Sequence, residues 1–478
     1  MKQYDAIIIG SGQAANPLAT RLAAIGWEVA LVEKKHIGGT CINEGCTPTK
    51  TLIASAKLAF QFARSGEYGL ENRPAYVDIS AVLLRKESVV KRFRSSLQKG
   101  LINQENVDIL FGKAEFTGHK EITVTDSQNN KVQFRGKYIF INTGARPFVP
   151  AIKGLETIPY FTSSSILDLQ EIPERLIIIG AGPVAIEFAQ VYSRLGSDVI
   201  MIGRSDRLLE KEDPDVGEEI KSILQDEGIL MLFSTEVDEM GNNSDGVITL
   251  RVSNKNGKHT VTGTHVLIAT GRIPNSDALH PNQTGVETDE NGYIIVNEKL
   301  ETGADGIYAL GDVKGGPAFT HIAYNDYLVV YKNLVENKNV TIKERPVPYC
   351  IFTDPEFARI GLNETEAREK NLPVEIAKVP VTWVARATET GEPRGFIKAI
   401  VHAQTKKILG AAVIGAGGGE LMAILQIAML GGVTAEQLAE NIFAHPTWAE
   451  AINILFQSLP AAPAPSVSAM EMGVLTEK

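Results

Sequence analysis

The chain has 478 residues, of which 44% are hydrophobic, and its 57 acidic and 47 basic residues give a net charge of −10. This length supplies about three domains with separate cores, and the acidic balance excludes the basic surface that a nucleic-acid partner requires. No apolar run approaches the roughly 20 residues that cross a bilayer, and only three cysteines occur. We therefore expect a cytoplasmic protein without membrane contact or structural disulfides.

The first predicted unit is a dinucleotide-binding repeat. Residues 4–9 form an apolar strand that leads into Gly10, Gly12 and Ala15, and a helical pattern and a second strand then end at Glu33. In such a unit the first glycine makes the tight turn, the second lets a pyrophosphate approach, and the small third residue allows close helix packing. The acid binds the ribose hydroxyls. Close helix packing alone can also produce the glycines, so the prediction of a nucleotide site rests on the whole order of elements.

Two cysteines follow in the run GGTCINEGCTPTK, residues 38–50. Positions i and i+5 of a regular helix lie about 140° apart, so Cys41 and Cys46 can form a disulfide only where the helix is distorted, as Gly45 permits. A strained bond near a helix start is typical of a redox-active disulfide, because the helix terminus favours the thiolate. Two other interpretations stay open: buried unreactive thiols, and a metal site, for which two further ligands are missing nearby.

The dinucleotide pattern returns in RLIIIGAGPVAIEF, where Gly180, Gly182 and Ala185 take the same places. The second strand of this repeat is followed by Gly203 and Arg204 in place of an acid, and Arg207 comes three residues later. Arginines can pair with a 2′-phosphate that an acid would repel, so this repeat predicts NADPH in preference to NADH. The alternative is that both arginines are solvated surface residues.

Three shorter segments end strands. NTGARP at residues 142–147 and ATGRIP at residues 269–274 each place Thr and Gly at a chain reversal, as crossings between domains would. The segment ADGIYALGDV ends with Gly311 and Asp312, whose carboxylate can accept hydrogen bonds from a polyol chain. Cys350 stands alone and is expected to be an ordinary buried cysteine.

Together these motifs resemble the pyridine nucleotide-disulfide oxidoreductases, the flavoenzyme family of glutathione reductase, dihydrolipoamide dehydrogenase and mercuric reductase. The resemblance runs from about residue 4 to about residue 460 and includes an AHPTWAE element at residues 444–450. It implies FAD and NADPH as cofactors and a homodimer with shared active sites. The residues that it places at the cofactors are Gly10, Gly12, Ala15, Glu33, Gly39, Thr40, Thr143, Gly144, Asp312, Thr320, Gly180, Gly182, Ala185, Arg204, Arg207 and Gly271.

The resemblance also implies the fold class, which is α/β with two Rossmann-like three-layer domains and a C-terminal α+β dimerisation domain. Residues 381–415 read as strands alternating with turns, and helices follow them. The expected domains are an FAD-binding domain at residues 1–150 and 276–340, an NAD(P)H-binding domain at 151–275, an interface domain at 341–460 and a flexible tail at 461–478.

The implied reaction passes electrons from NADPH through the flavin to the cysteine pair. By position in the motif Cys46 is the thiol nearest the flavin, and Cys41 is the exposed interchange thiol. His445, oriented by Glu450, is implied to act as base and acid toward the cysteines of the other subunit. Without the resemblance, a structural histidine is the better interpretation.

Two further elements are implied to hold the flavin. Lys50 and Glu187 pair beside flavin N5 and steady charge as hydride moves. The helix that begins near Thr320 and His321 offers backbone N–H groups to the pyrimidine end of the ring.

We infer the substrate class by comparing this chain with the residues that individual members of the family usually carry. Dihydrolipoamide dehydrogenases generally carry an acid at the position of Gly203 and a second His at Phe443, and glutathione reductases usually place a gating Tyr at Pro183. The segments GGTCINEGCTPTK and ARATETGEPRGFIKA resemble mercuric reductase, yet its C-terminal cysteine pair is missing and His445 replaces its Tyr. We therefore expect a mercuric-reductase-like enzyme with a disulfide or metal-ion acceptor. The alternatives are a dihydrolipoamide dehydrogenase, a glutathione-reductase-type enzyme, a soluble transhydrogenase and a non-enzymatic nucleotide-binding scaffold.

Overall fold

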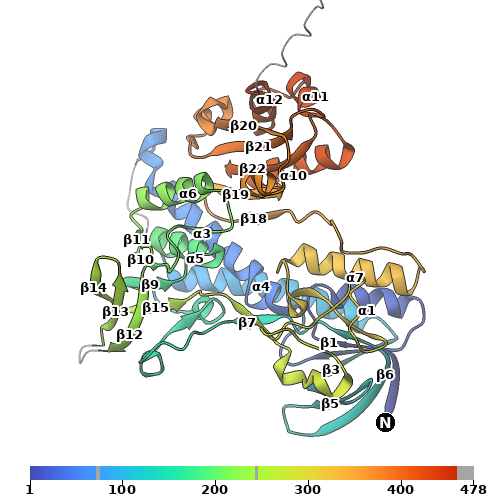
Figure 1. Cartoon of the computed structure of the whole chain (residues 1–478). Helices are drawn as coiled ribbons and strands as arrows, with labels where there is room; N and C mark the ends of the chain where they lie inside the picture. Colours follow the sequence, from blue (N-terminus) through green and yellow to red (C-terminus); the bar gives the residue numbers. More distant parts are fainter. Residues whose placement is uncertain (72–75, 243–245, 460–478) are drawn as a thin grey trace, which may run out of the picture. The chain divides into compact units, whose positions relative to one another are not determined.

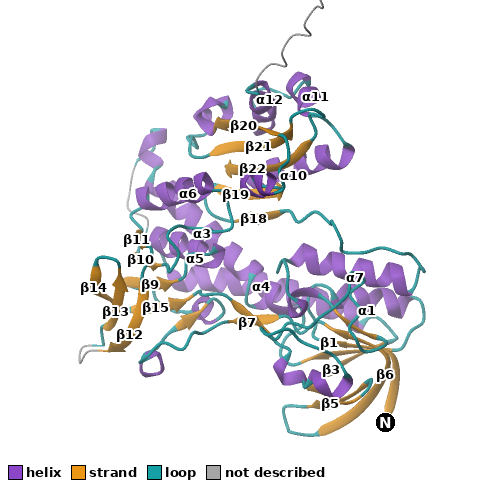
Figure 2. Ribbon diagram, viewed as in Figure 1, coloured by secondary structure: helices purple, strands orange, loops and turns teal. Residues whose placement is uncertain are grey.

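A computed structural model describes residues 1–71, 76–242 and 246–459 (Figure 1). The tail expected at residues 461–478 lies outside them. The chain divides into two compact units, residues 1–354 and residues 355 onward. Helices and strands alternate along the first unit (Figure 2), which confirms the mixed α/β class. The helices of the first unit are α1 (Ala15–Ala24), α2 (Gly39–Asn43), α3 (Cys46–Ala63), α4 (Ile79–Ile102), α5 (Pro183–Leu195), α6 (Pro214–Asp226) and α7 (Thr320–Leu334).

The first sheet begins with the predicted N-terminal strand. Its strands are β1 (Lys2–Ile9), β2 (Val29–Glu33), β3 (Val107–Phe111), β4 (Lys113–Gly118), β5 (Glu121–Thr125), β6 (Lys131–Ile141) and β17 (Ile307–Ala309). They lie in the order β3-β2-β1-β6-β5-β4, with β17 also paired to β6. The pairs β1–β2, β1–β6 and β17–β6 are parallel. The chain therefore returns to its first sheet after the second repeat.

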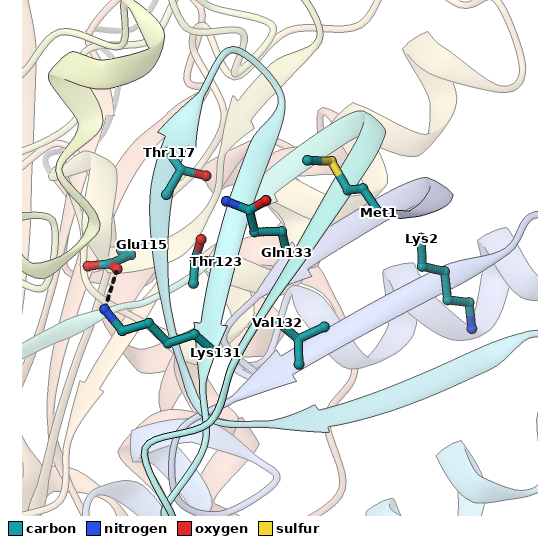
Figure 3. A pocket seen from close by; sticks show the side chains of 8 residues that line it. All are labelled: Met1, Lys2, Glu115, Thr117, Thr123, Lys131, Val132 and Gln133. Atoms are coloured by element: carbon teal, nitrogen blue, oxygen red, sulfur yellow. Dashed lines mark ion pairs between the residues drawn. The ribbon is translucent and has the colours of Figure 1, made fainter.

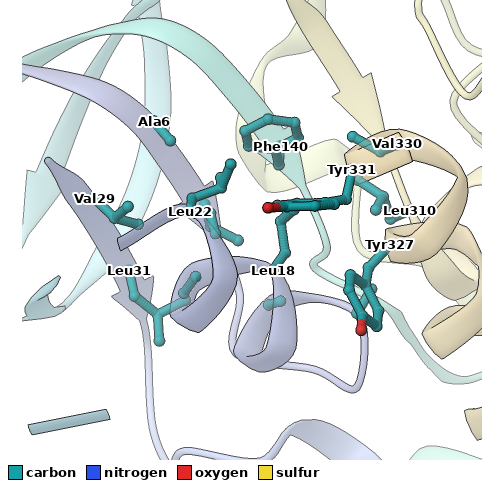
Figure 4. Packing of buried hydrophobic residues seen from close by; sticks show 14 of the residues in the cluster. Ala6, Leu18, Leu22, Val29, Leu31, Phe140, Leu310, Tyr327, Val330 and Tyr331 are labelled. Carbon is teal, nitrogen blue, oxygen red and sulfur yellow. The ribbon is translucent and has the colours of Figure 1, made fainter. Parts of the chain in front are cut away.

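Successive residues of β1 point to opposite faces of the sheet. Ala6 and Ile8 belong to the cluster that contains α1 and α7, and Ile7 and Ile9 belong to a separate cluster on the other face. Figure 4 shows the first cluster, where side chains of both helices meet Phe140 of β6. These last four residues of β1 are almost inaccessible, so the end of the strand is held from both sides and fixes the turn that follows it.

The second sheet repeats the arrangement. Its strands are β8 (Phe161–Thr162), β9 (Arg175–Ile179), β10 (Asp198–Ile202), β11 (Leu230–Leu232) and β15 (His265–Ile268). They lie in the order β11-β10-β9-β15-β8 and are parallel. The succession β9-α5-β10 therefore matches β1-α1-β2. An antiparallel sheet of β12 (Glu236–Asn242), β13 (Ile248–Asn254) and β14 (Gly257–Gly263) adjoins it in the sequence.

The two TG-containing segments pair with each other. β7 (Ala145–Pro147) and β16 (Arg272–Pro274) form a two-stranded antiparallel sheet in which Ile273 lies opposite Arg146. The sequence predicts two chain crossings at these places, but it contains no signal for their mutual pairing. Because of this pairing, the links into and out of the second repeat lie side by side.

The second unit contains an antiparallel sheet. Its strands β19 (Glu356–Gly361), β20 (Val374–Pro380), β21 (Phe396–His402) and β22 (Ile408–Gly415) lie in the order β19-β22-β21-β20. Its helices are α8 (Glu364–Glu369), α9 (Ala385–Glu389), α10 (Gly418–Gly431), α11 (Ala435–Glu440) and α12 (Ala451–Gln457). The strands and helices expected from residue 396 onward are present.

One part of that expectation is wrong. Residues 381–389 are helical, with a 3-10 turn at Val381–Trp383 followed by α9. Strand β20 ends at Pro380, which has no N–H to donate to a ladder. Ala385 and Ala387 then favour a helical turn, because alanine has the highest helix propensity.

Candidate active site

The first glycine turn has the geometry that a dinucleotide requires. Gly10 has φ +94, and a Cβ there would lie 2.3 Å from the carbonyl oxygen of Asn142, so only glycine fits. Glu33 is buried at the end of β2, where its carboxylate accepts hydrogen bonds from Ser11 N (3.1 Å), Ser11 Oγ (2.6 Å) and Lys35 N (2.8 Å). The predicted acid therefore lies against the glycine turn, at the edge of the parallel strands.

The cysteine segment packs directly on this turn. A Cβ on Gly39 would lie 2.8 Å from Cα of Gly12, so the two glycine segments are in contact. The helical run is interrupted after α2, and Gly45 has φ −143 and ψ −113. A Cβ on Gly45 would lie 3.0 Å from the carbonyl oxygen of Thr40. The distortion expected between the cysteines is present, and it places one cysteine in α2 and the other at the first position of α3.

Both sulfur atoms contact one hydroxyl group. Thr320 Oγ1, at the start of α7, donates to Cys41 Sγ at 3.0 Å and lies 3.6 Å from Cys46 Sγ. Both cysteines are free thiols. Cys46 is exposed and Cys41 is half-buried in this chain, which is the reverse of the exposure expected for an interchange thiol at Cys41. The tertiary structure thus brings three elements, α2, α3 and α7, to the sulfur pair.

The two thiols differ in acidity. The pKa of Cys46 is lowered to about 6, first by a hydrogen bond from the Cys41 thiol and then by the Thr320 hydroxyl and the charge of Lys50. The pKa of Cys41 is raised, because the same hydrogen bond and burial both favour its protonated form. The site therefore holds one thiolate at Cys46 near neutral pH and one thiol at Cys41.

The expected lysine–glutamate pair is present. Lys50 Nζ lies 2.9 and 2.7 Å from the two carboxylate oxygens of Glu187, so α3 and α5 are joined one turn after Cys46. Glu187 is buried and also accepts the backbone N–H of Phe352 at 2.9 Å. The Phe352 ring lies 4.7 Å from the Lys50 ammonium group. The pair is therefore held in place by a segment that the sequence does not single out.

The second glycine turn is open toward its ligand side. A Cβ on Gly180 would lie 2.3 Å from the carbonyl oxygen of Ala269, whereas a Cβ on Gly182 would meet nothing within 4 Å. Gly182 directly precedes α5, whose N-terminal N–H groups suit an anion. Arg204 is exposed, and Arg207 donates to the carbonyl oxygen of Glu210 at 3.0 Å. Both arginines follow β10, as predicted.

The GD segment contains Asp312, whose carboxylate oxygens are available as hydrogen-bond acceptors. The Asp312 carboxylate has no hydrogen-bond donor among the described residues, and burial raises its pKa. Nearby, Asn16 Oδ1, Asn142 Oδ1 and Thr143 Oγ1 are buried and likewise lack a partner within the described part of the chain. These groups surround the first glycine turn, so the residues present fit a ligand with hydroxyl donors and a pyrophosphate.

The remaining predicted residues take the following positions. Gly144 has φ +69 and Gly271 has φ +130, and both lie at the β7–β16 sheet. In the second unit, His445 Nδ1 lies 2.8 Å from Glu450 Oε2, so the carboxylate orients the ring. The His445 side chain is 70% exposed and Glu450 is largely buried. Ala15 and Ala185 are both inaccessible, which agrees with close packing at the helix starts.

Several other features lie outside these motifs. A surface hollow of about 700 Å³ lies over β4, β5 and β6 (Figure 3) and contains none of the predicted site residues. Cys350 is half-buried and donates to the carbonyl oxygen of Ile351. Within the described ranges no group of three His, Cys, Asp or Glu side chains is arranged to hold a metal ion. None of the helices described there is long and apolar enough to cross a bilayer.

A dithiol at a helix start, packed on one of two dinucleotide repeats, defines a flavoprotein disulfide reductase. The family model for pyridine nucleotide-disulphide oxidoreductases matches residues 4–326, and the model for the dimerisation domain of that family matches residues 347–455. The chain belongs to this family, whose members are oxidoreductases that bind FAD, use a pyridine nucleotide and carry a redox-active disulfide.

Known relatives resemble almost the whole chain. A probable pyridine nucleotide-disulfide oxidoreductase, RclA of Escherichia coli strain K12, is 35% identical over 460 residues, which cover 95% of this chain and 99% of that protein. A mercuric reductase of Lysinibacillus sphaericus is 32% identical over 451 residues, 94% of this chain and 82% of the relative. The solved Cu(II) complex of the HOCl-induced flavoprotein disulfide reductase RclA superimposes with a TM-score of 0.87 at 34% identity, covering 96% and 99% of the two chains.

Proposed function

We propose that this protein is an NADPH-dependent, mercuric-reductase-like flavoenzyme that passes electrons through FAD to the Cys41/Cys46 pair and on to a metal ion or a disulfide. The observation that carries the proposal is the contact of both sulfur atoms with Thr320, the first residue of α7. This contact places a thiolate and a thiol together at the start of that helix. Bound FAD would supply a two-electron relay between the nicotinamide and the disulfide.

The first glycine turn and the GD segment would hold FAD. Glu33 would bind the adenosine ribose, the glycines would admit the pyrophosphate, and Asp312 would accept from the ribityl hydroxyls. Thr40, Thr143 and the N-terminus of α7 complete the proposed site. The Lys50–Glu187 pair would keep a positive charge near the reacting end of the ring, and Phe352 would hold that pair in place.

The two cysteines would have different roles in the steps that follow reduction of the flavin. Two electrons and one proton, the equivalent of the hydride from NADPH, break the sulfur–sulfur bond and leave a thiolate at Cys46 and a thiol at Cys41. Deprotonated Cys41 then attacks the acceptor. It displaces a thiolate from a disulfide, or it binds a metal ion, and the Cys41–Cys46 disulfide forms again as two electrons pass to one Hg(II) or to two Cu(II) ions. His445 of the partner subunit would take the proton from Cys41 and return one to the leaving thiolate, and Glu450 would hold its ring in the productive orientation.

Metal-ion reduction is the form of the proposal that the comparisons favour. The E. coli relative was solved as a Cu(II) complex, and other relatives are mercuric reductases. A soft metal ion matches the softness of a thiolate pair. A disulfide acceptor needs the same two sulfurs, so only turnover with defined acceptors distinguishes the two.

The nucleotide preference is part of the proposal. Gly203 leaves no acid beside the 2′-position, and Arg204 and Arg207 can pair with a 2′-phosphate. Replacing both arginines by alanine should raise the KM for NADPH about 100-fold or more, since each charge-assisted hydrogen bond contributes about 1.5–3 kcal/mol and a factor of ten corresponds to about 1.4 kcal/mol. The kinetics with NADH should change little. Equal efficiency of the wild type with both nucleotides contradicts this assignment.

We also propose the domain boundaries expected from the sequence and a cytoplasmic location. The FAD-binding segments are residues 1–150 and 276–340, the nucleotide-binding segment is 151–275, and the interface segment is 341–460. The return of β17 to the first sheet supports the split FAD-binding domain.

A steady-state acceptor screen tests the function. The holoenzyme is supplied with NADPH and, in turn, Cu(II), Hg(II), glutathione disulfide, lipoamide and quinones. Cys41→Ser should lower turnover with metal ions or disulfides at least 100-fold and leave NADPH oxidation by quinones nearly unchanged. Cys350→Ser is the matched control and should behave as wild type. Unchanged turnover of Cys41→Ser with every acceptor contradicts the proposal.

A soluble transhydrogenase is the second candidate, because it needs nucleotide-binding repeats of this kind, but it needs no dithiol, so the presence of both cysteines argues against it. It predicts fast exchange of electrons from NADPH to NAD that a Cys46→Ser change leaves unaffected.

A further inference from the structure

The turn that presents Asp312 is fixed by two buried polar side chains from other elements. Asn142 Nδ2 donates to the carbonyl oxygen of Leu310 at 2.7 Å, and the N–H of Gly311 donates to Asp326 Oδ2 at 2.8 Å. Both bonds are buried, and they engage consecutive backbone groups directly before Asp312. The backbone of this turn therefore has little freedom to rotate.

Asn142 lies between the two turns that the proposed FAD site requires. A Cβ on Gly12 would lie 2.7 Å from Asn142 Oδ1, and a Cβ on Gly311 would lie 2.8 Å from Asn142 Nδ2. Asn142 is only 7% exposed, and its Oδ1 has no partner among the described residues. One amide group therefore sets the spacing between the glycine turn and the GD turn.

The internal repeat shows that the fold itself does not need this amide. Ala269 occupies the corresponding place in the second repeat, where a Cβ added to Gly180 would lie 2.3 Å from the Ala269 carbonyl oxygen, just as a Cβ added to Gly10 would lie 2.3 Å from that of Asn142. Both repeats therefore have the same close approach of a carbonyl oxygen to the glycine turn, and the amide side chain occurs only in the first repeat. An addition confined to one of two equivalent places points to a task in ligand binding.

Asp326 has a matching role on the opposite side of the turn. It is completely buried on α7, and its carboxylate lies 2.5 Å from Arg345 and 3.4 Å from Lys314. Burying a carboxylate is costly unless it is paired and hydrogen-bonded. The Arg345 and Lys314 side chains pair this buried carboxylate, and the Gly311 N–H is hydrogen-bonded to it.

We infer that Asn142 and Asp326 are positioning residues for FAD, which fix the turn of Leu310 and Gly311 so that Asp312 faces the ribityl chain. This inference rests on the proposed function, because it takes Asp312 as the FAD ligand. Neither residue touches the reacting atoms. Their effect is to lower the freedom of the turn before the cofactor binds.

The test measures release of FAD from the purified holoenzyme by the rise of flavin fluorescence after dilution. Asn142→Ala should speed release about tenfold, the factor that corresponds to loss of one hydrogen bond of typical strength. The KM for NADPH should change less than twofold, because the second repeat is untouched. The visible circular dichroism of the bound flavin should also change, which a purely structural defect elsewhere would not cause.

Asn333→Ala is the matched control. Asn333 Nδ2 donates to the carbonyl oxygen of Val340, also at 2.7 Å, at the far end of α7. This variant should lower thermal stability and leave FAD release unchanged. If Asn142→Ala does not fold, Asn142→Ser replaces it, because a serine hydroxyl is too short to reach Leu310, and the same acceleration is expected.

Asp312→Ala separates the inference from the proposed function. Faster FAD release from both Asp312→Ala and Asn142→Ala supports the inference. If only Asp312→Ala accelerates release, the positioning role is overturned and the FAD site stands. If Asp312→Ala has no effect on FAD release, the assignment of Asp312 as the residue that binds FAD is wrong, and the inference is overturned with it.

Discussion

At the scale of residues, the cysteine pair is asymmetric before any substrate arrives. Cys46 begins α3, where the helix terminus, the Thr320 hydroxyl and Lys50 all stabilise a negative charge. Cys41 lies in a separate short helix and donates its proton toward Cys46. This difference agrees with the proposed roles, in which the Cys41 thiol attacks the acceptor once it is deprotonated and the Cys46 thiolate faces the flavin.

The pH dependence of alkylation tests this asymmetry. Because the thiolate is the nucleophile and the pKa of Cys46 is lowered to about 6, the rate of alkylation of the reduced protein should rise as pH increases through about 6 and level off above it. Thr320→Val removes the hydroxyl group that contacts both sulfur atoms and helps to lower the pKa of Cys46, so it should move the midpoint upward by about one pH unit. The rate is followed with iodoacetamide and mass spectrometry. A wild-type midpoint near the ordinary thiol value contradicts the assignment.

At the scale of elements, α3 and α5 are joined by a buried ion network as well as by the Lys50–Glu187 pair. Arg194 of α5 lies 2.7 Å from Asp354 and 2.7 Å from Glu227, and all three side chains are at most 5% exposed. Lys57 of α3 lies 2.7 Å from the other oxygen of Asp354. Burial opposes ionisation of Asp354, but Arg194 and Lys57 outweigh it and lower its pKa. This network anchors the segment that begins at Phe352.

Arg194→Ala should therefore lower the free energy of unfolding by about 3–5 kcal/mol, because it leaves two buried carboxylates without their common partner. Arg175→Ala is the matched control. Arg175 also lies 2.7 Å from its partner, Asp198, but both are about half exposed, and such pairs contribute about 0–1 kcal/mol. Urea unfolding of the two variants gives both values. Similar losses of unfolding free energy in the two variants would contradict a larger contribution from the buried network.

At the scale of the whole molecule, the dimerisation domain needs an apolar face for its partner. Helix α10 exposes Ile424, Ile427 and Leu430, of which Ile427 is 66% and Leu430 83% exposed. Residues three apart lie on one side of a helix. An exposed apolar stripe in a domain that matches a dimerisation family is expected to be covered by a second copy.

Ile427→Glu should produce a monomer, since it places an unpaired charge in that interface. Sedimentation velocity measures the mass. The monomer should retain FAD and still be reduced by NADPH, but its turnover with the acceptor should fall at least 100-fold, because His445 of the partner subunit is then missing. Val132→Glu, a change at a 51% exposed position of β6, should stay dimeric and active. A fully active Ile427→Glu monomer contradicts a shared active site.

Much of the fold could be predicted from the sequence because its signals are local. Strand, glycine turn, helix and strand follow each other within about 30 residues in both repeats. The first glycine of each repeat, Gly10 or Gly180, marks a place where a side chain would collide with the backbone that follows a neighbouring strand. The helical residues 381–389 were predicted wrongly, because apolar β-branched residues also suit a strand and only the neighbouring Pro380 and the alanines decide the outcome.

The sequence by itself determined the family, the two dinucleotide repeats and the cysteine pair, since these depend on residue types at fixed short spacings. The tertiary structure alone decided which distant groups meet: Thr320 at the sulfurs, Phe352 at the Lys50–Glu187 pair, and Asn142 with Asp326 around the GD turn. Their partners lie 15 to 279 residues away along the chain. No local pattern encodes such contacts, because they form only when strands and helices have packed.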